Sequence, residues 1–218
     1  MTDATTNWEC IDAFQKLAFS PENRGASWGA STYFGLPLLK WPCDLHLYQE
    51  LVFTLKPQLI IETGTYRGAS ALFFAHLLDQ IGWGKVITID AELTTPDYPR
   101  HPRICYLGGK SSVDSVIAEE VNRLLPDYGQ VLVVLDSDHS KAHVLKELNM
   151  YQDFVTPGSY MVVEDINLGT ELFRPEDGPG AQAALDLWLP KHPEFRLDQQ
   201  KANKYLFSTN AWLRRVIL

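Results

Sequence analysis

Short apolar runs alternate along the chain with longer segments in which apolar residues recur every three to four positions. The short runs predict buried strands, and the longer segments predict amphipathic helices. Strands are expected at residues 59–63, 86–90, 103–107, 131–136 and 160–165. Helices are expected at residues 8–19, 44–55, 69–81, 112–125, 141–154 and 180–189. Residues 195–218 predict two or three further short strands.

This order of strands and helices predicts an α/β fold. Because the strand runs are apolar throughout, the sheet should be mostly parallel, with helices on both faces. Asp44 is the expected N-cap of the helix at 44–55, and Ser111 or Ser112 is the expected N-cap of the helix at 112–125. In such a sheet a ligand binds beyond the carboxyl ends of the strands, where the strand order switches.

The first 40 residues are expected to form an N-terminal helix and cap segment, ahead of a single globular domain at residues 41–218. A glycine-containing loop follows that helix. Its aromatic residues are Trp28, Tyr33, Phe34 and Trp41. They either line a pocket or fasten the loop to the core, and the sequence alone favours neither interpretation.

Composition narrows the class of protein. The chain has 218 residues, 45% of them hydrophobic, which is enough for a full core. A formal net charge of −8 opposes binding to nucleic acid or to an anionic membrane surface. The N-terminus lacks the basic and apolar regions of a signal peptide, and no apolar run reaches the roughly 20 residues of a membrane span. With three cysteines and no C-x-x-C motif, we expect reduced thiols and a cytoplasmic protein.

A glycine turn follows the first predicted strand, in IIETGTYRGAS (60–70). Gly64 and Gly68 allow a tight turn and close approach of a ligand, and the amides that begin the next helix can hold an anionic group. Asp90 ends the next strand, 26 residues after Gly64. An acid at that place can accept both hydroxyls of a ribose. Together these features predict a nucleoside site.

Two other nucleotide motifs are absent. The dinucleotide fingerprint G-x-G-x-x-G fails at Tyr66, which disfavours a nicotinamide oxidoreductase. The segment GGKSS (108–112) is not a phosphate loop, because Ile104 stands where that motif requires glycine.

Two predicted strands run directly into acidic residues, in VLVVLDSDHS (131–140) and YMVVEDIN (160–167). Parallel strands end at the same edge, so Asp136, Glu164 and Asp165 should converge. Three carboxylates in a small volume repel one another unless a cation or protons lie between them. Oxygen ligands of this kind suit Mg²⁺. The alternative is that one acid caps the following helix and another pairs with a basic residue, without a metal.

His139 lies three residues after Asp136, where the chain leaves the predicted strand. A histidine with a pKa near neutrality can take a hydroxyl proton, and a metal bound to the same hydroxyl would lower the hydroxyl's pKa. His143, one helical turn further, is the competing candidate. It is expected to face solvent or the sheet.

Two sets of motifs resemble known families. The pattern E-x-G-x-x-x-G-x-S at residues 62–70 resembles the first motif of S-adenosylmethionine-dependent methyltransferases, in particular the metal-dependent O-methyltransferases. The segments LDSDHSKAHVLKEL and VVEDIN resemble the cephalosporin hydroxylase family, whose relatives include rhamnosyl and macrolide-sugar O-methyltransferases. Further segments extend this likeness from about Trp28 onward: WGASTYFGLPLLKWPCDLHLYQELV, GPGAQAALDLWL and KYLFSTNAWLRRV.

The resemblance implies a Rossmann-like class I methyltransferase with a seven-stranded sheet. It implies S-adenosylmethionine and Mg²⁺ as cofactors, and a hydroxyl of a sugar or small natural product as the methyl acceptor. Asp136, Glu164 and Asp165 would be the Mg²⁺ ligands, and His139 the general base. Subunit number does not transfer, so a homo-oligomer remains an open expectation.

The resemblance also implies a set of cofactor-binding residues, from the methionine end to the adenine end. They are Glu62, Thr63, Gly64, Thr65, Gly68, Ser70, Asp90, Ala91, Ser111 and Asp136, with Ser112 as a further candidate for adenine. One departure concerns the adenine contacts, because Lys110 stands where many relatives have an acid.

Several alternative functions stay open. A haloacid-dehalogenase-type phosphatase would use Asp136 as nucleophile and Asp138 as acid/base, but three predicted strands precede this D-x-D, and only about 25 residues separate the two acidic clusters. A non-catalytic cofactor-binding or scaffold protein would keep the glycine turn without the acids and His139. Chemistry like that of the cephalosporin hydroxylases is the third alternative.

Overall fold

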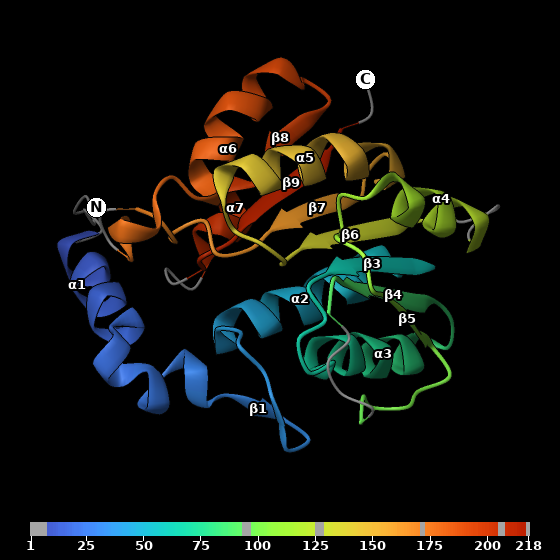
Figure 1. Ribbon diagram of the computed structural model, residues 1–218, viewed down its shortest axis with the longest axis horizontal. Helices are drawn as coiled ribbons and strands as arrows, with labels where there is room; N and C mark the ends of the chain where they lie inside the picture. Colours follow the sequence, from blue (N-terminus) through green and yellow to red (C-terminus); the bar gives the residue numbers. More distant parts are fainter. Residues whose placement is uncertain (1–7, 93–96, 125–128, 171–172, 205–207, 217–218) are drawn as a thin grey trace, which may run out of the picture.

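The computed structural model describes residues 8–92, 97–124, 129–170, 173–204 and 208–216. Its strands in the main sheet are β3 (Leu59–Thr63), β4 (Lys85–Asp90), β5 (Ile104–Gly108), β6 (Val131–Leu135), β7 (Tyr160–Val163), β8 (Phe195–Leu197) and β9 (Ala211–Arg215). They lie in the order β5-β4-β3-β6-β7-β9-β8 (Figure 1). Every neighbouring pair is parallel except the two that include β9. The predicted α/β fold with a mostly parallel seven-stranded sheet is therefore confirmed.

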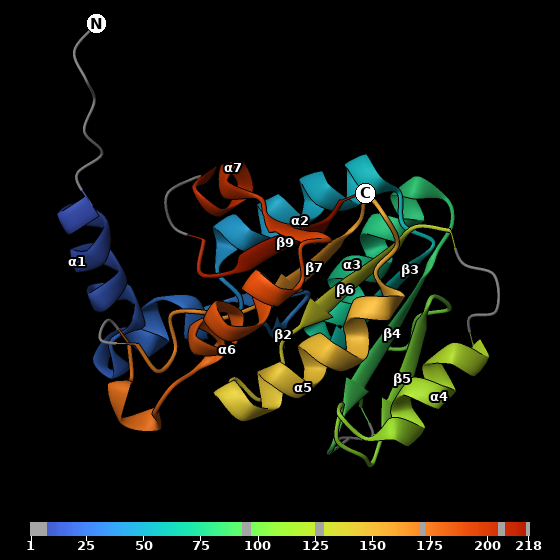
Figure 2. The ribbon, with the colours of Figure 1, turned by 90° about the horizontal axis from the view of Figure 1, so that it is seen from above.

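Helices cover both faces of this sheet (Figure 2). They are α2 (Pro42–Leu55), α3 (Ala69–Ile81), α4 (Ser115–Leu124), α5 (Lys141–Tyr151), α6 (Ala181–Trp188) and α7 (Gln199–Ala202). The helix α1 (Trp8–Phe19) lies apart from the sheet (Figure 2). Successive residues of a strand point to opposite faces. Ile60 and Val162 accordingly belong to the core under α2 and α3, whereas Ile61 and Val163 belong to the core under α4, α5 and α6.

The strand order switches between β3 and β6. From β3 the chain continues outward to β4 and β5, then returns to β6 on the other side of β3. The register pairs Thr63 with Leu135, and Leu135 with Val163, so the carboxyl ends of β3, β6 and β7 are level. Residues that follow these ends are thereby brought together.

The expected N-cap of α2 is wrong. This helix begins at Pro42, with Trp41 in the N-cap position, because proline's fixed φ suits a first helical turn. Asp44 lies inside the first turn and is only 1% exposed. The Asp44 carboxyl group is therefore buried, and it does not cap the helix from the solvent side.

The expected N-caps of α4 are also wrong. The helix begins at Ser115, and the carboxylate of Asp114 accepts a hydrogen bond of 3.0 Å from the backbone N–H of Val116. Ser111 and Ser112 are left in the loop between β5 and α4. Residue 125, the predicted end of this helix, lies outside the described residues.

Two or three short strands were predicted for the tail, and its described residues contain β8 and β9, separated by α7. Five short 3₁₀ helices complete the described helical elements: η1 (Pro21–Ala26), η2 (Trp28–Ala30), η3 (Gln152–Phe154), η4 (Pro175–Asp177) and η5 (Leu189–Lys191). Within the described ranges, no helix combines the length and apolarity needed to cross a membrane.

Residues 8–41, the N-terminal segment, carry α1, η1, η2 and a hairpin of β1 (Thr32–Tyr33) and β2 (Leu36–Pro37). The aromatic residues of this segment were expected either to line a pocket or to fasten the loop to the core, and they divide between these two roles. The Tyr33 hydroxyl lies 2.9 Å from Nδ1 of His76 on α3, so this side chain fastens the hairpin to the domain. Trp28 and Trp41 pack against Phe19 instead, with ring centroids 6.2 and 5.7 Å away.

Candidate active site

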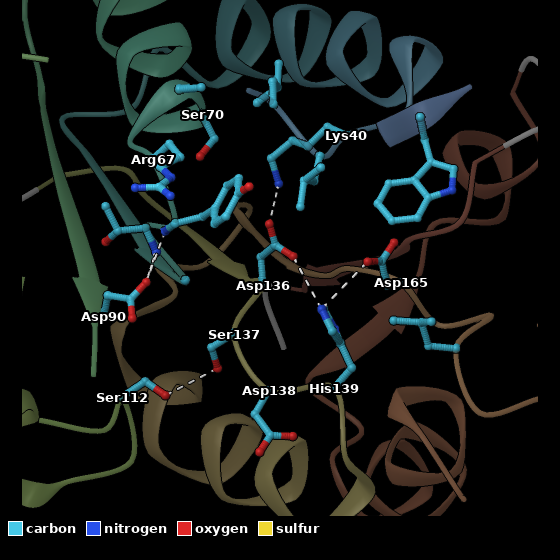
Figure 3. Close-up of a pocket in the computed structure, with 18 of the residues that line it drawn as sticks. Lys40, Arg67, Ser70, Asp90, Ser112, Asp136, Ser137, Asp138, His139 and Asp165 are labelled. Carbon is cyan, nitrogen blue, oxygen red and sulfur yellow. Dashed lines mark hydrogen bonds and ion pairs between the residues drawn. The ribbon is translucent and has the colours of Figure 1, made fainter. Parts of the chain in front are cut away.

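A cavity of about 650 Å³ lies at the carboxyl edge of the sheet (Figure 3). Most of the residues predicted to form the site line it: Gly64, Thr65, Ser70, Asp90, Ala91, Ser111, Ser112, Asp136, His139 and Asp165. Four others lie behind the first layer of the wall: Glu62, Thr63, Gly68 and Glu164. The strand ends and the N-terminal segment both contribute to this one cavity.

The glycine turn packs directly on the end of β6. Gly64 has φ +87°, and a Cβ at this position would lie 1.9 Å from the backbone oxygen of Asp136. The Asp136 N–H in turn donates to the backbone oxygen of Thr63 at 3.1 Å. A glycine is thus required at 64, and the turn holds the backbone of the strand end that carries Asp136.

Asp90 holds the same turn from the other side. Its Oδ2 accepts hydrogen bonds from the backbone N–H groups of Thr65 at 2.9 Å and Tyr66 at 3.0 Å. Its Oδ1 accepts from the backbone N–H of Glu92 at 3.0 Å. A carboxylate offers about four lone-pair positions. Asp90 therefore keeps acceptor capacity for a ligand while it fixes the turn.

Glu62 lies beneath the turn and is fully buried. Its Oε2 accepts from the Thr88 hydroxyl at 2.7 Å, and that hydroxyl lies 2.8 Å from the hydroxyl of Thr65. Burial raises the pKa of Glu62 to about 7. In this structure Glu62 supports the turn from below, one layer behind the cavity wall.

Strand geometry decides where the acids of β6 and β7 point. Residues two apart in a strand share a face. Asp136 follows Val134 by two positions and Glu164 follows Val162, and both valines face α2 and α3. The two carboxyl groups are accordingly directed to that face. Asp165 lies beyond the end of β7 with φ +53°, so the alternation of the strand does not extend to it.

Lys40 meets these two carboxylates. Its Nζ donates to Asp136 Oδ2 at 2.7 Å and to Glu164 Oε1, and the side chain is 2% exposed. The Tyr48 hydroxyl also donates to Glu164 Oε1, at 2.6 Å. Glu164 is thereby held between Lys40 and Tyr48, out of the cavity wall.

Burial and the neighbouring opposite charges shift the pKa values of Lys40, Asp136 and Glu164 in opposite directions. Burial raises the pKa of Glu164 and of Asp136, and the lysine's charge acts against that rise. Burial alone would lower the pKa of Lys40, but the carboxylates of Asp136 and Glu164 raise it above its ordinary value. The two carboxylates therefore favour the charged form of Lys40 beneath the acidic edge.

Asp136, His139 and Asp165 form a group on the cavity side. Each offers one ligand atom, and these atoms lie within 4.8 Å of one another. His139 Nε2 is 3.7 Å from Asp136 Oδ1 and 3.6 Å from Asp165 Oδ2 (Figure 3). Asp165 has φ +53°, and its N–H donates to the side chain of Asn210 at 3.1 Å. Backbone strain in a residue of this kind is found most often at functional sites.

This group fits a hard divalent cation. Carboxylate oxygens are the ligands that Mg²⁺ prefers, and imidazole nitrogen suits other metals better. Burial raises the pKa of Asp165, and the neighbouring Glu164 raises it further. A bound cation would offset that cost, so Asp136 and Asp165 are the side chains best placed to hold one.

An aromatic wall adjoins the acidic group. Phe19, Trp28, Trp41 and Phe173 all line the cavity. The ring centroid of Phe19 lies 5.2 Å from that of Phe173, which links α1 to the loop after β7. This part of the cavity wall is formed by aromatic rings, unlike the polar part around Asp90.

Contributors to the site that the sequence did not reveal include Lys40, Ser137 and Glu147. Lys40 had a usable signal, since it is the one charged residue in the otherwise apolar run GLPLLKWP (35–42). The prediction for His143 is wrong. It lines the cavity, and its Nε2 lies 2.9 Å from the Ser112 hydroxyl, because the first turn of α5 abuts the cavity.

Comparison with a family model and with known sequences gives relatives that carry the same description. The chain matches the family described as Rhamnosyl O-methyltransferase/CmcI over residues 26–216. A rhamnosyl O-methyltransferase of Mycobacterium tuberculosis is 37% identical over 183 residues, which cover 82% of this chain and 74% of the relative. One from Mycobacterium leprae is 36% identical over 194 residues, covering 86% and 84%.

Comparison with solved structures gives the same fold. CmcI with Mg and S-adenosylmethionine superposes with a TM-score of 0.69 at 22% identity, covering 87% of this chain and 78% of CmcI. MycE from mycinamycin biosynthesis, in complex with Mg, S-adenosylhomocysteine and mycinamycin VI, gives a TM-score of 0.53 at 18% identity. That match covers 94% of this chain and 54% of MycE.

The fold is thus the class I methyltransferase fold, and the methyltransferase class expected from the sequence is confirmed. The phosphatase and oxidoreductase alternatives lose their support. This chain belongs to the rhamnosyl O-methyltransferase/CmcI family.

Proposed function

We propose that the protein transfers a methyl group from S-adenosylmethionine to a hydroxyl group of a sugar or small natural product, with Mg²⁺ as a second cofactor. The observation that carries this proposal is the position of Asp136, His139 and Asp165. They face the same cavity as the glycine turn and Asp90. A nucleoside site and a cation site thereby adjoin.

The polar half of the cavity is proposed to hold S-adenosylmethionine. Gly64 and Thr65 give the methionine end close access to the backbone, and Ser70 at the start of α3 is placed for its carboxylate. Asp90 is proposed to accept a ribose hydroxyl through the lone pair on Oδ1 that the backbone N–H groups leave free. Ala91 and Ser111 complete the wall toward the base.

Asp136 and Asp165 are proposed to hold Mg²⁺. Glu164, the third predicted ligand, would have to use Oε2, because Oε1 is taken by Lys40 and Tyr48. When bound, S-adenosylmethionine supplies the methyl group, and Mg²⁺ lowers the pKa of the acceptor hydroxyl.

His139 is proposed to act as general base. Its Nε2 takes the hydroxyl proton as the acceptor oxygen gains the methyl group. The carboxylates of Asp136 and Asp165, at 3.7 and 3.6 Å, stabilise the imidazolium that results. The same atoms would also permit His139 to ligate a metal. The preference of Mg²⁺ for oxygen favours the role of base.

The acceptor is proposed to lie against the aromatic wall. Trp28, Trp41 and Phe173 offer apolar faces beside the acidic group, which suits the flat side of a sugar ring. Relatives named rhamnosyl O-methyltransferases, and MycE with its bound mycinamycin VI, support a glycosidic acceptor. A cytoplasmic location remains part of the proposal, and the three free cysteines favour it.

Calorimetric titration of S-adenosylmethionine into the protein, with and without Mg²⁺, tests the cofactor assignment. NADH serves as the control ligand. Micromolar binding of S-adenosylmethionine and no heat from NADH are expected. Tight uptake of Mg²⁺ with no binding of S-adenosylmethionine would mean that the glycine turn is not a methionine-nucleoside site.

A further inference from the structure

A second polar group lies in the same cavity wall, away from the acids. It consists of Ser112 after β5, Ser137 after β6, and His143 and Glu147 on α5. Ser112, Ser137 and His143 line the cavity, whereas Glu147 is 1% exposed and lies behind them. Figure 3 shows Ser112 and Ser137 facing one another, and both line the same cavity as Asp90. With a ribose at Asp90, this group adjoins the base of a bound nucleoside.

Glu147 fixes the hydrogen of both serine hydroxyls. Ser112 Oγ donates to Glu147 Oε1 at 2.6 Å, and Ser137 Oγ donates to the same oxygen at 2.7 Å. A hydroxyl carries one hydrogen and two lone pairs. Each serine oxygen, having given its hydrogen to Glu147, can only accept from other groups.

His143 fills part of that acceptor capacity. Its Nε2 lies 2.9 Å from Ser112 Oγ and 3.1 Å from Ser137 Oγ. Because both hydroxyl hydrogens are directed to Glu147, a protonated Nε2 would share its one N–H between the two serine oxygens. The hydrogen bond with Glu147 raises the pKa of His143, which favours a protonated Nε2. At least one lone pair remains on each serine oxygen, and both oxygens belong to cavity-lining residues.

The group is not a hydrolytic triad. In a triad, the carboxylate and the nucleophile contact different nitrogens of the histidine. Here Glu147 Oε1 is 3.5 Å from Nε2, the same nitrogen that both serines contact. The arrangement therefore orients hydroxyl groups and does not activate a nucleophile.

We propose that Glu147 is a positioning residue that makes Ser112 and Ser137 hydrogen-bond acceptors for the 6-amino group of adenine, so that the site rejects 6-oxopurines. This inference rests on the proposed function. The amino group brings two N–H donors to two acceptor oxygens. A 6-oxopurine brings an acceptor to the same place, where lone pair would meet lone pair and both partners would lose hydrogen bonds to water.

The test compares S-adenosyl-L-homocysteine with its 6-oxo analogue, S-inosyl-L-homocysteine, by calorimetry. For the unaltered protein we expect the amino compound to bind at least about thirtyfold more tightly, since a site built for a donor group strongly rejects an analogue that lacks it. Equal binding of the two compounds would overturn the inference and leave the proposed function intact. Binding of neither compound would remove both.

Substitution of Glu147 separates positioning from simple support. In Glu147→Leu the serine hydroxyls can rotate and donate, so affinity for the amino compound should fall at least about tenfold while the oxo compound keeps or gains affinity. An equal loss for both ligands would mean that Glu147 only supports the fold, which contradicts the proposal. Glu119→Leu, an exposed change on α4, is the control and should alter neither affinity.

A milder variant covers the case in which Glu147→Leu does not fold, as judged by its thermal melt. Ser137→Ala removes one acceptor at a half-buried position. It should weaken the amino compound by about three- to tenfold and leave the oxo compound unchanged. Unchanged discrimination in Ser137→Ala would contradict the proposal.

Discussion

The two regions that form the cavity obtain their functional residues in different ways. At the carboxyl edge of the sheet, Asp90, Asp136 and Asp165 come together because parallel strands end at the same level. In the N-terminal segment, Lys40 reaches its partners through contacts that span 96 and 124 residues of sequence. The edge follows from the regular fold, and the segment depends on tertiary packing.

The two regions also contribute different features to the cavity. The strand edge supplies the carboxylates that are proposed to accept from a nucleoside and to hold a cation. The N-terminal segment supplies a buried positive charge beneath the acids and an aromatic wall beside them. The first set defines a chemistry that many proteins of this fold can share, whereas the second sets the charge balance and the shape offered to the acceptor.

Removing a strand-edge acid should have the largest effect. In Asp136→Asn one proposed Mg²⁺ ligand is lost, and Mg²⁺-dependent turnover should fall at least about a thousandfold, because several kcal/mol of charge stabilisation disappear. Circular dichroism should show that the fold survives. Asp153→Asn, an exposed change, is the control for charge. Turnover within tenfold of the unaltered protein would exclude Asp136 from the metal site.

His139→Ala should have the next largest effect. Loss of a general base typically costs about a hundredfold or more in kcat. Affinity for S-adenosylmethionine and for Mg²⁺, measured by calorimetry, should stay unchanged. A fall in Mg²⁺ affinity together with turnover would instead identify His139 as a ligand. Unchanged turnover would falsify both roles.

Lys40→Met tests the contribution of the N-terminal segment. Because Asp136 and Glu164 lose their buried cation, the free energy of unfolding should fall by about 3 to 5 kcal/mol. Urea denaturation measures this change, with the exposed Lys16→Met as the control. Addition of Mg²⁺ should restore part of the loss by binding the folded state. A change below about 1 kcal/mol would show that the acids do not need the lysine.

The buried acid of α2 predicts a smaller, pH-dependent effect. Burial raises the pKa of Asp44 to about 7, well above its value in an unfolded chain. Between about pH 4 and 7 the folded state therefore binds more protons than the unfolded state, and stability from this group falls as pH rises.

Asp44→Asn removes that titration. Relative to this variant, the unaltered protein should lose up to about 1.4 kcal/mol of unfolding free energy per pH unit across that range. Urea denaturation at pH 5, 6, 7 and 8 compares the two proteins. Parallel stability curves for both proteins would contradict the assignment of a raised pKa to Asp44.

The sheet and most of its edge could be predicted because they follow from local patterns. Continuous apolar runs marked the strands, and Gly64 marked a turn where a Cβ would meet a backbone oxygen at 1.9 Å. Glu164 and Asp165 are adjacent in sequence, yet Glu164 contacts Lys40 and Tyr48 whereas Asp165 lies beside His139. Adjacency in sequence therefore did not mean shared partners.

The remaining features depend on contacts that no local pattern encodes. Lys40 appears in an irregular segment, and its partners follow from how that segment crosses the sheet edge. His143 was expected to face solvent or the sheet, yet the Ser112 and Glu147 side chains draw it into the cavity wall. The predicted N-caps were wrong for a similar reason. Pro42 begins α2, and Asp114 accepts from the first turn of α4, in place of the predicted caps.

The most direct test of the account is methyl transfer from methyl-labelled S-adenosylmethionine to a panel of rhamnosides and other hydroxylated glycosides. It is run with Mg²⁺, with EDTA, and with Mg²⁺ restored after EDTA. Label is expected to appear on an acceptor oxygen, to disappear with EDTA and to return with Mg²⁺. Undiminished transfer in EDTA would contradict a catalytic cation held by Asp136 and Asp165.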